Sequence, residues 1–438
     1  MGQTYIEQRT ARTEWFLKDR FGMFIHWGLY AIPARGEWVR NAERITVEDY
    51  QQYFDDFNPQ RYEPREWARA AKAAGMKYAV LTAKHHDGFC LFDSKLTDYK
   101  STKTKAGRDL VSEFLEAFRA EGLKVGLYYS LIDWHHPDYP AYGDTHHPMR
   151  DDETYKRDPD NFGRYLDYMH GQVRELLTDY GKLDVMWFDF SYDEMKAEKW
   201  RATELMETIR SLQPHILVDN RLEASGEGGG SIYTKNPSFF SGDFASPEQI
   251  IPPSGVTDDE GNSIPWEACI TLNNNWGYGS SDKTYKSAKT IIRKLVECVS
   301  KNGNLLLNVG PNAEGEIPDE SLAILAEVGK WMARNGASIY GCGQADLPKP
   351  EWGRFTSKGN KLYAHLFEES VGPINLAGLA GRIGKARLLS DGSEVFVSRP
   401  WNTALYPDDA FFNFAQPEVL TYPLPDERDT VVELTMIE

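Results

Sequence analysis

Carboxylates, histidines and one arginine follow short apolar runs of this sequence, and these residue types together can do acid–base chemistry. Asp189 ends the apolar run VMWFD, so its carboxyl group would lie at the rim of a hydrophobic interior. Capping a helix or pairing with a buried cation would also explain a carboxylate in that place. The chemical interpretation is a nucleophile or an acid–base group. Cleavage of a glycosidic bond needs two carboxyl groups across that bond, one of them kept protonated.

The second carboxyl group has to come from another loop, and three residues qualify. Glu248 lies in the loop segment SPEQ, Asp243 lies near the end of the sixth apolar run, and Glu267 stands at the start of a predicted strand. Glu248 could equally be a solvated loop residue, and the position of Glu267 favours a structural role. The residue types alone leave the choice among the three open.

Other polar and aromatic side chains stand after further apolar runs. Neutral imidazoles, carboxylates and an arginine suit the hydroxyl groups of a polyhydroxylated ligand, and flat rings suit its apolar face. Most of the 12 Trp, 23 Tyr and 21 Phe must still belong to the core. The residues predicted to form a cleft with Asp189 are His26, Glu37, Trp38, His85, His86, Tyr128, Trp187, Arg221 and Trp276.

Eight short apolar runs would position these side chains, and amphipathic segments lie between many of the runs. Continuous apolar strands that alternate with helices indicate parallel βα units. Eight units predict an α/β fold, a (β/α)8 TIM-like barrel whose chemistry collects at the carboxyl ends of the strands. A doubly wound sheet is the alternative. The runs are Met23–Trp27, Tyr78–Ala83, Val125–Tyr129, Val185–Phe188, Ile216–Val218, Phe239–Phe240, Cys269–Leu272 and Leu305–Val309, and the helical segments are 64–74, 109–121, 162–178, 200–212 and 285–300.

The chain changes character after about residue 345. Stretches such as KLYAHLF and TVVELTMI alternate between apolar and polar residues and are separated by Gly and Pro. This pattern predicts a small C-terminal antiparallel β-sandwich. We therefore predict a catalytic barrel over residues 1–342, a linker over 343–354 and the β-sandwich over 355–438.

Composition limits the partners of the protein. The 438 residues include 49 Lys and Arg against 66 Asp and Glu, a net charge of −17, which disfavours nucleic acid and anionic membranes. No apolar run approaches the roughly 18–20 residues of a membrane span. The N-terminus lacks the apolar segment and cleavage site of a secretory signal, so we expect a cytoplasmic protein. The sequence leaves open whether the chain forms a homo-oligomer.

The four cysteines show no metal-binding spacing, and we expect reduced, mostly buried thiols. We predict no metal and no cofactor. The cysteines are Cys90, Cys269, Cys298 and Cys342.

Eight motifs, in their order along the chain, resemble those of the α-L-fucosidases of glycoside hydrolase family 29. The resemblance covers residues 14 to about 343, and the combination is highly specific. It implies a retaining exo-glycosidase that releases terminal α-linked L-fucose from a fucosylated oligosaccharide or glycoconjugate through a covalent glycosyl-enzyme. The motifs are FGMFIHWG, GEW, KYAVLTAKHHDGF, LYYSLIDW, WFD, GDFASPEQ, WEACITLNNNWGY and LLLNVGP.

The resemblance also implies roles for single residues. The W-x-D motif makes Asp189 the nucleophile, and the SPEQ segment favours Glu248 as acid/base, ahead of Asp243 and Glu267. Phe190 departs from the pattern, because many family members have a small residue after the nucleophile, and a phenyl ring there would narrow the leaving-group side. His26, Glu37, His85 and His86 would bind fucose hydroxyls, Trp38, Tyr128 and Trp187 would line the pocket, Arg221 matches the family's arginine, and Trp276 would face the C5 methyl group.

Two other classes of function use the same residues. A metal-dependent hydrolase could hold zinc with His26, His85, His86 and Asp189. Against this, neighbouring residues such as His85 and His86 point to opposite faces of a strand, and the many tryptophans suit a sugar better. A non-catalytic glycan-binding barrel is the second alternative, and the presence of all the candidate carboxylates speaks against it.

Overall fold

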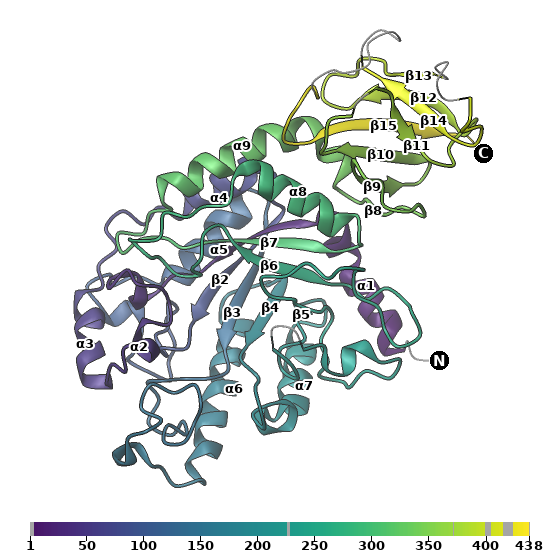
Figure 1. The fold of residues 1–438 in the computed structure, drawn as a ribbon. Coiled ribbons are helices and arrows are strands. Elements are labelled where there is room, and N and C mark those ends of the chain that lie inside the picture. The colour runs from purple at the N-terminus through teal and green to yellow at the C-terminus, as the bar shows by residue number, and fades with distance from the viewer. Residues whose placement is uncertain (1–3, 226–227, 371, 399–403, 415–423, 438) are drawn as a thin grey trace.

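A curled parallel sheet of seven strands forms the centre of the molecule (Figure 1). The computed structural model describes residues 4–225, 228–370, 372–398, 404–414 and 424–437. The strand order is β5–β4–β3–β2–β1–β7–β6, and each neighbouring pair is parallel. The α/β class is therefore confirmed. The strands are β1 (Phe21–Ile25), β2 (Tyr78–Lys84), β3 (Lys124–Ser130), β4 (Val185–Asp189), β5 (Leu217–Val218), β6 (Glu267–Thr271) and β7 (Asn304–Val309).

Helices follow most strands and cover the outer face of the sheet (Figure 1). All five predicted helical segments are present, with ends shifted by up to three residues. Local chemistry explains where they begin: Pro64 occupies the first turn of α4, and the Asp109 side chain accepts a hydrogen bond from the Ser112 amide at the start of α5. The helices are α1 (Tyr5–Asp19), α2 (Val39–Ala42), α3 (Val47–Asp56), α4 (Pro64–Ala73), α5 (Leu110–Ala120), α6 (Asn161–Asp179), α7 (Ala202–Leu212), α8 (Ala288–Val299) and α9 (Asp319–Asn335).

The predicted sixth strand is wrong. Phe239–Phe240 lies in a turn, and the Phe239 side chain is exposed. Residues 243–249 instead run between β5 and β6 and make single parallel bridges at Phe244, Ala245 and Glu248. Pro247 interrupts this segment, and a proline cannot donate a hydrogen bond to a strand ladder. The seven regular strands therefore do not form the predicted ring of eight.

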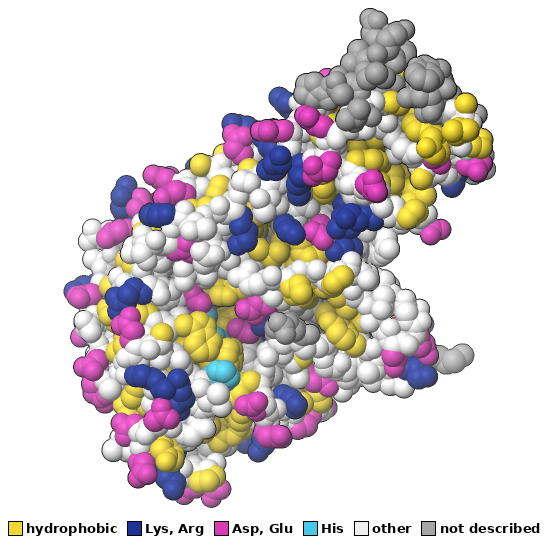
Figure 2. Space-filling view, in the orientation of Figure 1, with side chains coloured by type: hydrophobic (Ala, Val, Ile, Leu, Met, Phe, Trp, Pro, Cys, Tyr) yellow, Lys and Arg dark blue, Asp and Glu magenta, His cyan; other side chains and the backbone are white. Residues whose placement is uncertain are grey.

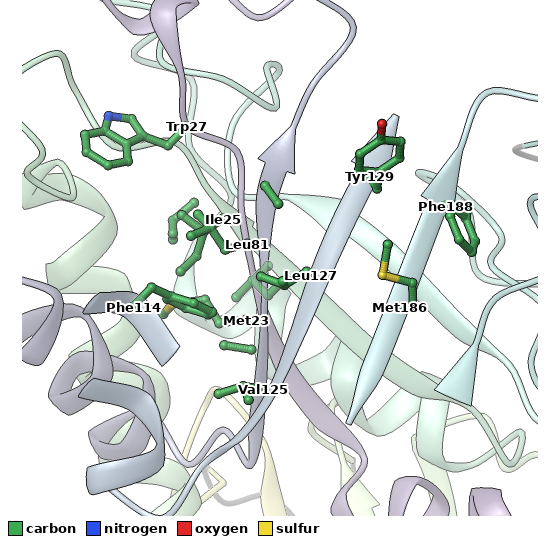
Figure 3. Close-up of a cluster of buried hydrophobic side chains, with 14 of the residues drawn as sticks. Met23, Ile25, Trp27, Leu81, Phe114, Val125, Leu127, Tyr129, Met186 and Phe188 are labelled. Carbon is green, nitrogen blue, oxygen red and sulfur yellow. The ribbon is translucent and has the colours of Figure 1, made fainter. Parts of the chain in front are cut away.

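Side chains on the two faces of the sheet belong to different cores. Met23 and Ile25 of β1 point outward and pack with residues of the covering helices, such as Phe114 of α5 (Figure 3). Phe24, between them, points to the inner side and packs with Phe16 of α1 and other rings. Successive residues of a strand point to opposite faces, so the inner face of each strand leads toward the same enclosed space.

Two antiparallel sheets form the C-terminal part, which confirms the predicted strand type. They pack around a common apolar core to which both contribute. Trp331 of α9 donates to the Asp429 carbonyl, and Arg293 of α8 donates to the Arg428 carbonyl, so this part rests on α8 and α9 (Figure 1). The five-stranded sheet contains β12 (Ile383–Leu388), β15 (Thr430–Met436), β10 (Lys361–Leu366), β9 (Gly353–Lys358) and β8 (Gly343–Gln344), and the three-stranded sheet contains β11 (Ile374–Leu376), β14 (Ala410–Asn413) and β13 (Phe396–Ser398).

Within the described part of the chain, we find no helix with both the length and the apolar character needed to cross a membrane.

Candidate active site

A cavity of about 180 Å³ opens at the carboxyl ends of the strands. It is smaller than the roughly 300–1,000 Å³ of pockets for drug-sized ligands, which suits a group the size of one sugar ring. Figure 2 shows hydrophobic and histidine side chains beside acidic ones in a hollow on this face of the molecule. The lining residues are Phe24, His26, Glu37, Trp38, His85, His86, Tyr128, Trp187, Asp189, Phe190, Arg221, Ser225, Glu248, Cys269 and Trp276.

The pocket brings together both predicted catalytic residues and all nine predicted binding residues. The remaining two candidates, Asp243 and Glu267, do not line it. Four lining residues carry no predicted binding or catalytic role: Phe24, Phe190, Ser225 and Cys269. Strand alternation could have identified two of them, because Phe24 precedes His26 by two residues and Cys269 follows Glu267 by two.

One nitrogen of Arg221 connects the two pocket carboxylates. Its Nη1 atom donates to Asp189 Oδ1 at 2.8 Å and to Glu248 Oε2 at 2.9 Å. The two oxygens therefore lie no further apart than these two hydrogen-bond lengths taken together. This limit is compatible with the roughly 5–5.5 Å between the carboxyl groups of retaining glycosidases.

Arg221 is held from several sides, so its position is fixed before any ligand binds. Its Nε donates to Ser246 Oγ at 2.9 Å and its Nη2 to the Ser246 carbonyl at 3.0 Å. The guanidinium also lies over the ring of Trp187, 4.6 Å from the ring centroid. A buried arginine held in this way is a fixed positive charge between two acids.

Asp189 differs from Glu248 in its surroundings. Tyr128 donates to Asp189 Oδ2 at 2.8 Å, and burial together with the charge of Glu248 raises the pKa of Asp189, whereas the Arg221 guanidinium opposes that rise. The Glu248 side chain keeps 33% of its surface exposed, against 14% for Asp189. Asp189 is thus a fixed group at the pocket wall, and Glu248 stands where the pocket meets solvent.

Three histidines form one side of the pocket, and burial lowers the pKa of each. The pKa of His26 falls to about 3, and those of His85 and His86 fall well below their ordinary value. All three are therefore neutral near pH 7. His26 Nδ1 is paired with Asn308 Oδ1 at 2.7 Å and His86 Nδ1 with Ser130 Oγ at 2.8 Å.

One ring nitrogen of His85 makes no hydrogen bond within the described part of the protein. That nitrogen is the buried Nδ1. A buried polar atom without a partner is costly, so a ligand hydroxyl that reached it would be bound favourably. His85 also stacks on the Tyr128 ring, with centroids 5.5 Å apart, which fixes the direction of the imidazole.

Glu37 and Trp276 come from different loops, and the backbone amide of the residue after Trp276 connects them. Glu37 Oε2 accepts from the Gly277 amide at 2.8 Å, and burial raises the pKa of this carboxyl group. A Cβ atom at Gly277 would lie 2.8 Å from the Tyr30 ring, so only glycine permits this close approach. The contact places the Trp276 ring 5.1 Å from His26, measured between ring centroids.

Asp243 and Glu267 lie away from the pocket. Asp243 is fully buried and accepts hydrogen bonds from Arg12, Arg210 and the Val218 amide at 2.7–2.9 Å. Glu267 begins β6, is buried, and accepts a hydrogen bond from the Tyr78 hydroxyl. Burial raises the pKa of Glu267 to about 8. Neither carboxyl group reaches the cavity that holds Asp189.

All four cysteines are buried free thiols, as expected. Cys269 lies in the pocket wall, and burial raises its pKa well above the ordinary value. In the described ranges of the chain, no group of three or more His, Cys, Asp or Glu side chains is arranged to hold a metal ion.

Comparison with known proteins agrees with this geometry. Residues 3–337 match the family model of the alpha-L-fucosidases. The chain belongs to the alpha-L-fucosidase family. The predicted resemblance to glycoside hydrolase family 29 is thereby confirmed, and the tissue alpha-L-fucosidase of Homo sapiens is 30% identical over 97% of this chain and 89% of its own length.

Solved structures of alpha-L-fucosidases share the whole fold. Alpha-L-fucosidase isoenzyme 1 from Paenibacillus thiaminolyticus is 64% identical, with a TM-score of 0.95 over 98% of this chain and 100% of that chain. A GH29 alpha-L-fucosidase from Bacteroides thetaiotaomicron is 29% identical, with a TM-score of 0.82 over 100% of this chain and 97% of that chain. That second structure is described as a trapped covalent intermediate in complex with 2-fluoro-fucosyl fluoride.

Proposed function

We propose that this protein is an exo-acting, retaining alpha-L-fucosidase that hydrolyses terminal α-L-fucosides of oligosaccharides or glycoconjugates. The observation that carries the proposal is the single Arg221 nitrogen bonded to both Asp189 and Glu248 at one end of a sugar-sized cavity. Two carboxyl groups within this limit of one another are compatible with the spacing that a two-step retaining hydrolysis requires.

In the first step Asp189 attacks the anomeric carbon while Glu248 donates a proton to the departing oxygen. The bond to the leaving group breaks and an ester forms between Asp189 and the sugar. In the second step Glu248 takes a proton from water, the water oxygen attacks the anomeric carbon, and the ester bond breaks. Arg221 and Tyr128 hold Asp189 in the attacking position throughout.

Glu248 has to change its partner during this cycle. An ionised Glu248 is the natural partner of the Arg221 guanidinium. To act as an acid it must carry a proton and direct it at the leaving oxygen, which weakens its bond to Arg221. Since the Glu248 side chain is one-third exposed, it can turn without disturbing the buried Arg221–Asp189 pair.

The deeper part of the cavity would hold the fucose ring. Neutral His26, His85 and His86 can each donate and accept hydrogen bonds, so they suit hydroxyl groups. Glu37 would accept from a further hydroxyl. The Trp276 ring supplies an apolar surface for the C5 methyl group, and Trp38, Tyr128 and Trp187 would complete the pocket wall.

The arrangement of the whole chain belongs to the same proposal. We infer that residues 1–342 act as a (β/α)8-type catalytic barrel in which residues 243–249 take the place of an eighth strand. The connection over residues 343–354 already carries β8 and the first residues of β9, so it would join the barrel to the β-sandwich over 355–438 as part of the five-stranded sheet that supports α8 and α9. A cytoplasmic location and a homo-oligomeric state are consistent with the sequence.

Covalent labelling tests the proposal most directly. We expect 2-fluoro-fucosyl fluoride to inactivate the protein in a time-dependent manner and to add one fluorofucosyl group, found by peptide mass spectrometry on Asp189. The Asp189→Ala variant should stay unlabelled. Labelling of Glu248 or Asp243 instead would contradict the assignment of the nucleophile, and absence of both labelling and hydrolysis would contradict the proposed function.

A further inference from the structure

The residue after Asp189 has an unusual backbone conformation. Phe190 adopts φ = +84°, a left-handed conformation that is strained for a bulky residue. Such a conformation persists only where its surroundings enforce it. On one side of Phe190, the Asp189 carbonyl accepts from the Leu131 amide at 2.9 Å, and on the other, Ser191 Oγ donates to the Arg221 carbonyl at 2.7 Å. The backbone of Phe190 is therefore fixed from both ends.

The ring of Phe190 is fixed as well. Its centroid lies 5.4 Å from that of Trp38, 4.9 Å from that of His146 and 5.5 Å from that of Tyr192. His146 in turn contacts Tyr192 at 4.6 Å and Trp38 at 6.2 Å. These four rings, which we call the aromatic wall, come from three loops that follow β1, β3 and β4.

Hydrogen bonds between the loops hold the aromatic wall together. Asn41, just after Trp38, donates to the His146 carbonyl, and the Tyr192 hydroxyl donates to Asp144. The Tyr139 hydroxyl lies 3.1 Å from that of Tyr192 and adds a further link. The rings are thus held in place without a ligand, which lowers the entropy cost of binding against them.

Two rings of the aromatic wall, Trp38 and Phe190, line the cavity, and the other two pack against Phe190. All four rings of the aromatic wall are half-buried, as is Glu248, whereas deeper lining residues such as His85 and Arg221 are buried. In an exo-acting enzyme the terminal sugar fills the closed end, so the leaving group must pass between half-exposed residues. Phe190 lines the cavity directly beside Asp189, and its ring is therefore within reach of that leaving group.

We propose that Phe190, backed by the other rings of the aromatic wall, binds the leaving group and makes the enzyme favour leaving groups that present a flat apolar face. The inference rests on the proposed function and names a substrate class for it: α-L-fucosides of aromatic alcohols, or of sugars that expose an apolar C–H face. Offset or edge-on contact with a ring supplies the attraction, and the fixed wall supplies the selectivity.

Two substrates that differ only in the leaving group test this role. Fluoride, from α-L-fucosyl fluoride, is too small to reach the aromatic wall, whereas 4-nitrophenol, from the aryl fucoside, presents a flat ring. We expect Phe190→Ala to leave kcat/KM for the fluoride within about twofold. It should lower kcat/KM for the aryl fucoside about three- to tenfold, the size of one ring–ring contact.

Matched variants separate the ring from the backbone. Phe190→Gly should show the same loss of preference but a higher Tm than Phe190→Ala, because glycine adopts φ = +84° without strain. Tyr142, in the loop after β3, has an exposed ring that does not line the cavity. Tyr142→Ala should therefore leave kcat/KM unchanged for both substrates. If Phe190→Ala does not fold, Phe190→Leu keeps the apolar volume. It should lower the ratio of kcat/KM for the aryl fucoside to kcat/KM for the fluoride by a smaller factor.

Two results would overturn the inference while leaving the proposed function intact. An equal loss on both substrates would mean that Phe190 acts only by placing Asp189. No change in kcat/KM on either substrate in all three Phe190 variants would mean that the ring does not touch the leaving group. If the unmodified protein hydrolyses neither substrate, the proposed function fails and the inference fails with it.

Discussion

Asp189 and Glu248 line the cavity at the carboxyl ends of the strands, whereas Asp243 and Glu267 are sealed toward the opposite end. We call the first two the pocket carboxylates and the other two the sealed carboxylates. The pocket carboxylates share one guanidinium and face open space. Asp243 is instead enclosed by Arg12, Arg210 and a backbone amide, and Glu267 by the hydroxyl of a buried tyrosine.

The difference lies in the partners and not in the residue types. Protein groups bond both carboxylate oxygens of Asp243, and Glu267 is buried with the Tyr78 hydroxyl as its partner, so neither sealed carboxylate can approach a substrate. The pocket carboxylates have fewer cationic partners than their charge could accept, since one arginine serves two acids. Charge that the protein leaves incompletely compensated beside a cavity is available for chemistry.

The largest expected effect that separates the two pairs is on catalysis. Asp189→Ala should lower kcat on an aryl fucoside by about 10⁴-fold or more, because the covalent step has no nucleophile. Its Tm should change little, since Arg221 keeps Glu248 as a partner. Steady-state kinetics and thermal unfolding measure both quantities. Activity close to that of the unmodified protein would remove Asp189 from the mechanism.

The second largest expected effect distinguishes Glu248 from Glu267 by catalysis and by rescue with azide. Glu248→Ala should lower kcat about 10²- to 10⁴-fold, the range for losing a general acid–base group, and azide should restore activity by replacing the water nucleophile. Glu267→Ala should show no azide rescue, because its carboxyl group does not reach the cavity. If azide restored the activity of Glu267→Ala and left Glu248→Ala inactive, the assignment of Glu248 as the acid/base residue would be wrong.

Asp243 should affect the stability of the fold and not the chemistry. Asp243→Ala would leave the Arg12 and Arg210 guanidinium groups, 10% and 14% exposed, without their acid. Breaking a buried pair in this way costs about 3–5 kcal/mol of unfolding free energy. Urea unfolding should show that loss, while KM for the aryl fucoside stays the same in the folded fraction. A stable variant with a changed KM would contradict the structural role.

Much of this comparison could be predicted from the sequence, and the reasons for the remainder are physical. Six of the eight apolar runs overlap strands of at least five residues, because burial on both faces requires continuous apolar residues. The eight motifs contain ten of the eleven pocket residues that carry predicted roles, all except Arg221. The sealed role of Asp243 depends on Arg12 and Arg210, which come from helices remote in the sequence. No local pattern shows such a pairing.

The failed strand prediction has a similar cause. Phe239–Phe240 is apolar enough for a strand but only two residues long, and the bridging residues 243–249 contain a proline and few apolar residues. Their place between β5 and β6 depends on the edges of a sheet that forms from distant segments. The aromatic wall is likewise assembled from three loops, so only Trp38, in the GEW motif, and Phe190, next to the nucleophile motif, could be singled out from the sequence.

The smallest expected effect, counted per pH unit, is on the pH dependence of stability. The pKa of Glu267 is raised from 4.5 to about 8, so the folded protein keeps a proton that the unfolded chain releases in this range. Stability should therefore fall as pH rises from about 4.5 to 8, by up to about 1.4 kcal/mol per pH unit from this group. Glu267→Gln cannot titrate and should make that fall shallower, as measured by chemical unfolding at several pH values.

The pocket histidines provide the internal control for that experiment, because their shift has the opposite sign. The pKa of His26 is lowered from 6.5 to about 3, so the unfolded chain binds a proton that the folded protein does not, and stability should fall as pH drops below 6.5. Below about pH 4.5 Glu267 is protonated in both the folded and the unfolded chain, so Glu267→Gln should leave the acid-side fall unchanged there. If the variant altered both sides equally, Glu267 would be coupled to the pocket, and the division between pocket and sealed carboxylates would not hold.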